Sequence, residues 1–157
     1  MEIDGNAPAV GRAELEIQAP HELVWEVLTD VEGWPEWNPD VRSASLEGPL
    51  SPGTRFRWKA GPGTIVSTLE AVEPPGLIGW TGTTLGIHAI HVHRLEARGN
   101  VTVVTSEESW DGVLVRLLRR PLGRSLRSAV EGGLRHLKTE AERRAQAGLP
   151  AGPGGYD

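Results

Sequence analysis

Apolar and polar residues alternate along most of the chain, and this pattern predicts a protein built mainly from β-strands. In residues 54–60, for example, Phe56 and Trp58 alternate with basic residues. Seven such strands are predicted, at residues 12–19, 41–48, 54–60, 64–73, 77–83, 86–97 and 101–110. Short turn sequences such as "GPG" and "RGN" join several of them, which indicates an antiparallel meander rather than crossover connections.

Two other segments have the three- and four-residue spacing of helices. The first follows Pro20, a residue suited to a first helical turn, and ends before Gly33. The second is long and extends from about Pro121 to Ala147, where Gly148 and Pro150 stop it. Its apolar positions lie on one helical face: Leu122, Leu126, Ala129, Val130, Gly133, Leu134, Leu137 and Ala141.

The length of 157 residues fits one domain with a substantial core. We predict that this domain covers residues 12–147, after a flexible N-terminus (1–11) and before a disordered tail (148–157). The chain has no cysteine, which excludes disulfides and thiolate chemistry. No signal peptide and no apolar run long enough to cross a membrane is visible, so a cytoplasmic location is expected.

A sheet and a helix that each have one apolar face close most simply when the sheet curves around the helix. Gly132 and Gly133 lie in the middle of that helix, where each costs about 1 kcal/mol relative to alanine. Two interpretations remain open for Gly133. It allows close packing of helix on sheet, or it leaves room for a ligand.

Three stretches of the chain resemble the SRPBCC superfamily, which includes START, Bet v 1 and polyketide cyclase-like proteins. They are "ELEIQAPHELVWEVLTDVEGWPEWNP", "GTRFRWKAGPGTIVSTLEAVEPPGLIGWTG" and "TSEESWDG" followed by the amphipathic C-terminal helix. The resemblance implies an α+β helix-grip fold. In that fold a seven-stranded curved antiparallel sheet wraps around a long C-terminal helix, with two short helices after the first strand. The fold serves binders of lipids and hormones as well as polyketide cyclases.

Trp34 and Trp37 are three residues apart, which places both indoles on one face of a helical turn. In similar proteins this turn borders the mouth of a cavity. The two tryptophans are therefore predicted to wall or cover an apolar pocket. The alternative is that they plug the end of the sheet.

The stretch "HAIHVHRLE" holds His91 and His93 on one strand face and His88 on the other. Apolar residues favour either face as the inner one, and the resemblance favours the face of His93. The inner positions are then Ile87, Ala89, His91, His93 and Leu95, and on the next strand Thr102, Val104, Ser106, Glu108 and Trp110. This phase would bring Glu108 close to His91.

A half-buried carboxylate beside a histidine is able to move a proton, so His91 and Glu108 are the candidate acid and base. A polar pair without any reaction is the alternative. Two histidines and a carboxylate also make a metal-ligand inventory, but the spacing does not favour a site, and no metal and no cofactor are predicted. The sequence contains no G-x-S-x-G elbow, no phosphate-binding loop with its lysine and no dinucleotide fingerprint.

The C-terminal region is rich in basic residues, unlike the rest of the chain. The net charge of −5 argues against nucleic acid as a partner, yet seven Lys or Arg and one acid lie between Arg116 and Lys138. A solvated helix face explains such a segment, and a basic rim for an anionic ligand, a protein or a membrane surface is the alternative.

The leading hypothesis is a carrier of a small hydrophobic, lipid- or polyketide-like molecule in a cavity between sheet and helix. A polyketide cyclase/dehydratase-like enzyme and a protein- or membrane-interaction module are the alternatives. The predicted ligand-binding residues are Trp34, Trp37, Phe56, Trp58, Leu69, Trp80, His91, His93, Ser106, Glu108, Trp110, Leu126, Val130, Gly133 and Leu137.

Overall fold

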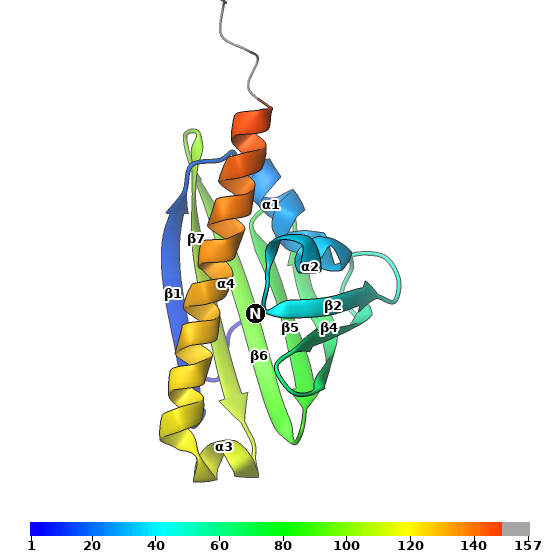
Figure 1. Cartoon of the computed structure of the whole chain (residues 1–157), viewed down its shortest axis with the longest axis vertical. Coiled ribbons are helices and arrows are strands. Elements are labelled where there is room, and N and C mark those ends of the chain that lie inside the picture. Colours follow the sequence, from blue (N-terminus) through cyan, green and yellow to red (C-terminus); the bar gives the residue numbers. More distant parts are fainter. Residues whose placement is uncertain (149–157) are drawn as a thin grey trace, which may run out of the picture.

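The computed structural model describes residues 1–148 and contains one antiparallel sheet of seven strands in the order β1-β7-β6-β5-β4-β3-β2. The strands are β1 (Ala9–Ile17), β2 (Val41–Leu46), β3 (Arg55–Ala60), β4 (Thr64–Glu73), β5 (Leu77–Thr84), β6 (Ile87–Arg98) and β7 (Val101–Asp111). The helices are α1 (His21–Thr29), α2 (Trp34–Trp37), α3 (Val113–Leu117) and α4 (Arg119–Ala147), with a 3₁₀ turn at Val31–Gly33. This architecture confirms the predicted helix-grip fold (Figure 1).

The structure differs from the prediction most at three elements, β1, α3 and α4. Strand β1 begins at Ala9 rather than residue 12, because β7 pairs with it from Trp110 onward. Residues 9–11, which the prediction assigned to the N-terminal segment, thus belong to β1. Helix α3 was not predicted, and α4 begins at Arg119, two residues before Pro121. The predicted tail begins at Gly148, and its other residues lie outside the described part of the chain.

Helix α4 lies along β1 and reaches β7 (Figure 1). Gly11 allows this close approach, because a side chain there would press on Leu126 and Val130 at 3.2–3.3 Å. Toward the other end of the helix, Lys138 Nζ donates a hydrogen bond to the Glu16 carbonyl. The backbone N–H of Gln18 donates to the Glu142 carboxylate at 2.9 Å. Helix α4 is thus tied to β1 at both ends.

The N-terminal residues run over the outer face of the sheet, away from α4. Arg94 donates to the Met1 carbonyl at 2.7 Å, and the Asp4 N–H donates to Ser109 Oγ at 3.2 Å. The Met1 side chain packs on Gly79, which pairs with Val92. Val92 is buried on the outer face for this reason, and its burial explains why the apolar pattern of β6 fits either phase.

The core consists of two groups of buried side chains, and the half-buried Ala13 of β1 packs against both. The larger group lies under α1 and α2 and includes Trp34, Phe56 and Trp80. The smaller group lies near the start of α4 and is formed by Ala9, Val115, Leu126 and Val130. Helix α4 contributes to both groups, since its Leu134, Leu137 and Ala141 belong to the larger one.

Candidate functional site

The break between the two core groups falls at the same level on three elements. On α4 it lies between Val130 and Leu134, where Gly133 is located. On β7 it lies between Val104 and Trp110, and on β6 between Leu95 and Ile87. The polar inner-face residues at this level are His91, His93, Ser106 and Glu108, and the half-buried Ala89 lies next to them, paired with Trp110. We refer to the region bounded by these four polar side chains and Gly133 as the core break.

Strand register brings the polar residues together. His91 pairs with Glu108 and His93 pairs with Ser106 across β6 and β7. Residues two apart on a strand share a face, so all four side chains point to the inner side of the sheet. This is the predicted phase, and His88 lies on the outer face.

Three short contacts join the polar side chains of the core break to one another and to Trp110. His91 Nε2 lies 2.8 Å from Ser106 Oγ, and Trp110 Nε1 donates to Glu108 Oε1 at 2.9 Å. His91 Nδ1 lies 3.5 Å from Glu108 Oε2 without a hydrogen bond of good geometry. Both side chains keep 13% of their surface exposed, so solvent reaches the pair only slightly.

Burial favours the neutral forms of these groups. Burial raises the pKa of Glu108 from 4.5 to about 7, although the Trp110 hydrogen bond acts in the opposite direction. Burial lowers the pKa of His91 from 6.5 to about 3, and that of His93 falls well below 6.5 through burial and the neighbouring His91. The contact between His91 and Glu108 is therefore one between a neutral imidazole and a carboxyl that is protonated below pH 7, rather than an ion pair.

Ser106, His91 and Glu108 are ordered like nucleophile, base and carboxylate in an acyl-transfer site. Two observations argue against that chemistry. The lowered pKa makes His91 a poor base. In addition, β7 is paired on both sides, so its ladder uses the backbone N–H groups that would serve as oxyanion donors. The arrangement is better suited to orienting a polar group or to holding a proton on Glu108.

We expect Glu108 to make folding stability fall as the pH rises from 4.5 to 7. Over that range the unfolded chain releases the Glu108 proton while the folded chain keeps it, which favours unfolding by about 3 kcal/mol in total. Glu108→Gln removes this titration. Urea unfolding at pH 8 should therefore show the variant to be more stable than the wild-type protein, with the difference fading below pH 4.5. Parallel stability curves across this range would contradict the raised pKa.

The two tryptophans of the predicted cover lie in different environments. Trp34 is only 5% exposed, its Nε1 donates to the Leu28 carbonyl at 2.9 Å, and it contacts Phe56, Trp58 and Trp80. Trp37 is half-buried, and its Nε1 is buried without a partner. Trp34 thus packs within the larger core group, whereas Trp37 lies at its margin.

The other residues predicted to contact a ligand also divide into buried core residues and half-buried residues at the margin of the core. Most of them are buried within the two core groups: Phe56, Leu69, Trp80 and Leu137 in the larger, and Leu126 and Val130 in the smaller. Trp58 and Trp110 are half-buried, and Trp58 Nε1 donates to Ser67 Oγ. The Trp80 ring lies 4.9 Å from the His91 ring and 5.2 Å from the His93 ring, so the aromatic side chains continue into the core break.

Gly133 faces open space, since a Cβ placed there would meet no atom within 4 Å. The loop before β2 approaches α4 beside it, where His136 Nε2 and Asp40 Oδ2 are 3.8 Å apart. Sequence reasoning did not select Asp40 or His136, because no pattern in the sequence shows that this loop meets α4.

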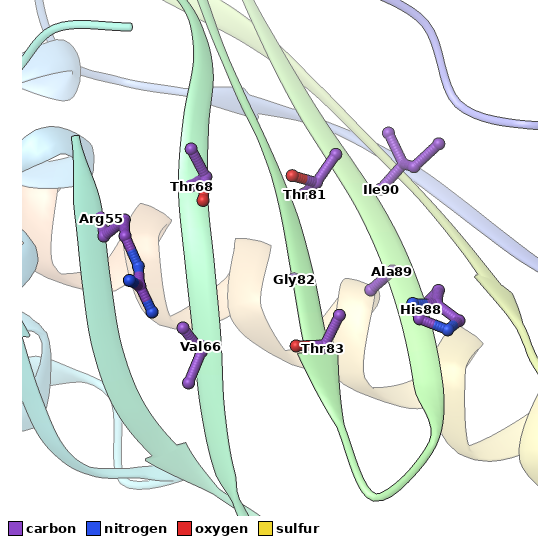
Figure 2. A pocket seen from close by; sticks show the side chains of 9 residues that line it. All are labelled: Arg55, Val66, Thr68, Thr81, Gly82, Thr83, His88, Ala89 and Ile90. Carbon is purple, nitrogen blue, oxygen red and sulfur yellow. The ribbon is translucent and has the colours of Figure 1, made fainter. Parts of the chain in front are cut away.

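Two hollows of the surface lie outside the space between the sheet and α4. One, of about 450 Å³, lies on the outer face of the sheet. Figure 2 shows its lining from β3 to β6, including Arg55, Thr81 and His88, with α4 behind the sheet. The other, of about 570 Å³, is bordered by arginines near the start of α4. The large cavity that the sequence predicts is thus not among these hollows, and the space under α1 and α2 is filled by aliphatic and aromatic side chains.

Within residues 1–148 no group of three or more His, Cys, Asp or Glu is arranged to hold a metal ion. In the same part of the chain, no helix combines the length and apolar character that crossing a bilayer requires.

Comparison with known proteins gives a family and a fold. A family model described as "Polyketide cyclase / dehydrase and lipid transport" matches residues 9–142. None of the curated proteins matches the chain. A hypothetical protein from Helicobacter pylori has a similar structure, with a TM-score of 0.78 at 16% identity over 88% of this chain and 91% of the other.

Two further solved structures have informative names. The Zhui aromatase/cyclase from Streptomyces sp. R1128 has a TM-score of 0.72 at 20% identity, over 89% of this chain and 98% of the other. A START superfamily protein from Mycobacterium smegmatis has a TM-score of 0.69 at 15% identity, over 86% and 98% of the two chains. At these identities the likeness shows the fold and carries no activity or ligand to this chain.

Proposed function

Because the chain belongs to the polyketide cyclase/dehydrase and lipid transport family, we propose that it binds a small hydrophobic, lipid- or polyketide-like molecule at the core break. The observation that carries this proposal is the alignment of the break on α4, β6 and β7. On each of these elements apolar packing stops at the level of Gly133 and the polar side chains. A core without a ligand would be expected to continue through this level.

Buried polar atoms without partners support the same proposal. Among the described residues, the Nδ1 atoms of His91 and His93 and the Nε1 atom of Trp37 are buried without a hydrogen bond. An unsatisfied buried polar group costs about 1–3 kcal/mol, and buried polar groups in native structures normally have a partner. A carbonyl or hydroxyl of a bound molecule would provide that partner, while its apolar part would contact Trp58 and Trp110.

The ligand would enter between α4 and the segment formed by α2 and β2. Trp37 and Trp58 keep part of their surface exposed on this side, and Asp40 approaches His136 across it. A drug-sized molecule needs more space than the packed inner face offers, so binding requires these side chains to move apart. Burial of the ligand contributes about 25 cal/mol per Å² of apolar area, less the cost of association.

Native mass spectrometry of protein purified from its own host tests this function. We expect a species heavier than the chain by the mass of one small molecule, which organic solvent removes and which partitions into the organic phase. A chain that stays unliganded in its host, and that takes up no lipid or aromatic polyketide when these are added, would contradict the proposal.

A polyketide cyclase/dehydratase-like enzyme is the second candidate. Of the predicted pair, Glu108 would move the proton, and the neutral His91 beside it would orient the substrate. This candidate is favoured by one observation, the Glu108 pKa of about 7, which is suited to proton transfer near neutral pH. Mass also separates the two candidates when a linear poly-β-ketone is supplied. A carrier releases it unchanged, whereas a cyclase that dehydrates its product releases a molecule lighter by one water.

A further inference from the structure

The exposed large apolar side chains of the described residues gather at one end of the molecule. They are Leu85, Val113, Leu114, Leu117 and Leu118, and three of them, Leu85, Val113 and Leu117, are 64–76% exposed. Leu85 lies in the turn between β5 and β6, and the others lie in or directly after α3. Figure 1 shows α3 and this turn at the same end of the molecule. The backbone of Gly112, just before α3, packs closely on the Gly86 carbonyl, so the turn and the helix form one surface.

A leucine at position 85 is energetically unfavourable for two reasons. Its φ of 48° lies in the left-handed region that favours glycine or asparagine, and its apolar side chain faces solvent. Residue 86, its neighbour, is a glycine with φ 76°, which shows what a turn of this shape ordinarily takes. Interior packing does not explain a leucine that is exposed in this way, whereas contact with an apolar partner would.

Five arginines lie beside these side chains, and four of them have no acidic partner among the described residues. Arg116 pairs with Asp111 at 3.0 Å. Arg119, Arg120, Arg124 and Arg127 form no ion pair with any residue of the described chain and border the hollow at the start of α4. The whole chain carries a net charge of −5, so this end is opposite in sign to the rest of the molecule.

We propose that this end of the molecule docks on the surface of a bilayer that contains anionic phospholipid. Leu85, Val113 and Leu117 would enter the region between headgroups and acyl chains, and the arginines from Arg119 to Arg127 would contact lipid phosphates. The negative charge of the remaining surface would be repelled by the same bilayer, which orients the molecule with α3 toward the membrane.

The shape of the surface favours a bilayer over a protein partner. The apolar side chains project from a five-residue helix and a turn, and the hollow beside them is lined by arginines and Pro8 rather than by apolar groups. A projecting apolar ridge with a basic flank fits a fluid interface, whereas a protein would require a groove of matching shape. This inference does not depend on a ligand at the core break.

Cosedimentation with lipid vesicles tests the proposal. The full chain should bind vesicles of phosphatidylcholine that contain about one third phosphatidylserine. Binding to vesicles of pure phosphatidylcholine, or binding at high salt, should be much weaker. Each basic residue at a membrane surface contributes about a factor of five, so Arg119→Glu with Arg120→Glu should weaken binding at least tenfold. Leu117→Asp, at a site 76% exposed, should do the same without affecting folding.

The matched control is Arg98→Glu with Arg135→Glu, which makes the same change in net charge at two exposed arginines away from this end. It should bind vesicles within about twofold of the wild-type protein. Thermal unfolding by circular dichroism shows that each variant is folded. The proposal is overturned if the wild-type chain does not bind anionic vesicles at low ionic strength. It is also overturned if the variants at Leu117 and Arg119/Arg120 bind as the control does.

Discussion

Replacing Trp34 with alanine is expected to lower the free energy of unfolding by about 3–5 kcal/mol. The indole is buried among three other aromatic side chains, with its ring centroid 5.5–5.7 Å from those of Phe56, Trp58 and Trp80. Its loss leaves a cavity that α2 is too short to close, and it leaves the Leu28 carbonyl without its donor. Equilibrium unfolding in urea, followed by circular dichroism, measures the change.

Trp37→Ala is the matched control for this prediction, because it removes the same side chain from the same short helix. Trp37 is half-buried and its Nε1 has no partner, so its loss should cost about 1 kcal/mol or less. Its main effect should be on ligand affinity. Equal destabilisation by the two substitutions would show that Trp37 also belongs to the packed core.

Gly133→Leu is expected to weaken binding of a hydrophobic probe, such as anilinonaphthalene sulfonate, at least about tenfold. A Cβ at position 133 meets no atom within 4 Å, so a leucine side chain would extend into the space that we assign to the ligand and would compete with it. A titration that follows probe fluorescence measures the affinity. Unchanged affinity in a folded variant would exclude ligand binding at the core break.

Two alanine substitutions separate the effect of glycine on helix stability from the effect of side-chain volume on ligand binding. Gly132→Ala and Gly133→Ala should each stabilise the chain by about 0.5–1 kcal/mol, because alanine favours the helix and no atom obstructs its Cβ. Gly132 faces Asp40 at 4.0 Å rather than the core break, so its substitution should leave probe affinity unchanged. This control shows that the effect at position 133 comes from side-chain volume.

Periodicity was sufficient to predict the sheet and the C-terminal helix. In β7 the apolar positions Val104 and Trp110 indicated the correct inner face, whereas in β6 the alternation fitted either face and the family resemblance gave the choice that the structure shows. The early start of β1 was missed because Gly11 interrupts the alternation, and only the packing of α4 against it reveals the reason. Helix α3 was missed because it exposes apolar side chains, which contradicts the expected amphipathic pattern.

The site was harder to predict than the fold, for a physical reason. A large apolar residue on the inner face has the same sequence signature whether it faces a ligand or another core residue, and Phe56, Leu69 and Trp80 are buried against their neighbours. Gly133 was informative because a missing side chain on an apolar helix face has few explanations. The position at which the core divides depends on distances between β6, β7 and α4, which no local pattern encodes.

The attachment of α4 to β1 limits which part of the protein can move to accommodate ligands of different size. Gly11 sets the helix against the strand near one end, and Lys138 and Glu142 clamp it near the other. The long helix therefore acts as a fixed wall, and plasticity is left to the opposite side. There β2 is an edge strand paired only with β3, and its register is interrupted between Val41 and Ser43. Changes in the breadth of accepted molecules should accordingly arise from substitutions in residues 37–60 rather than in the helix itself.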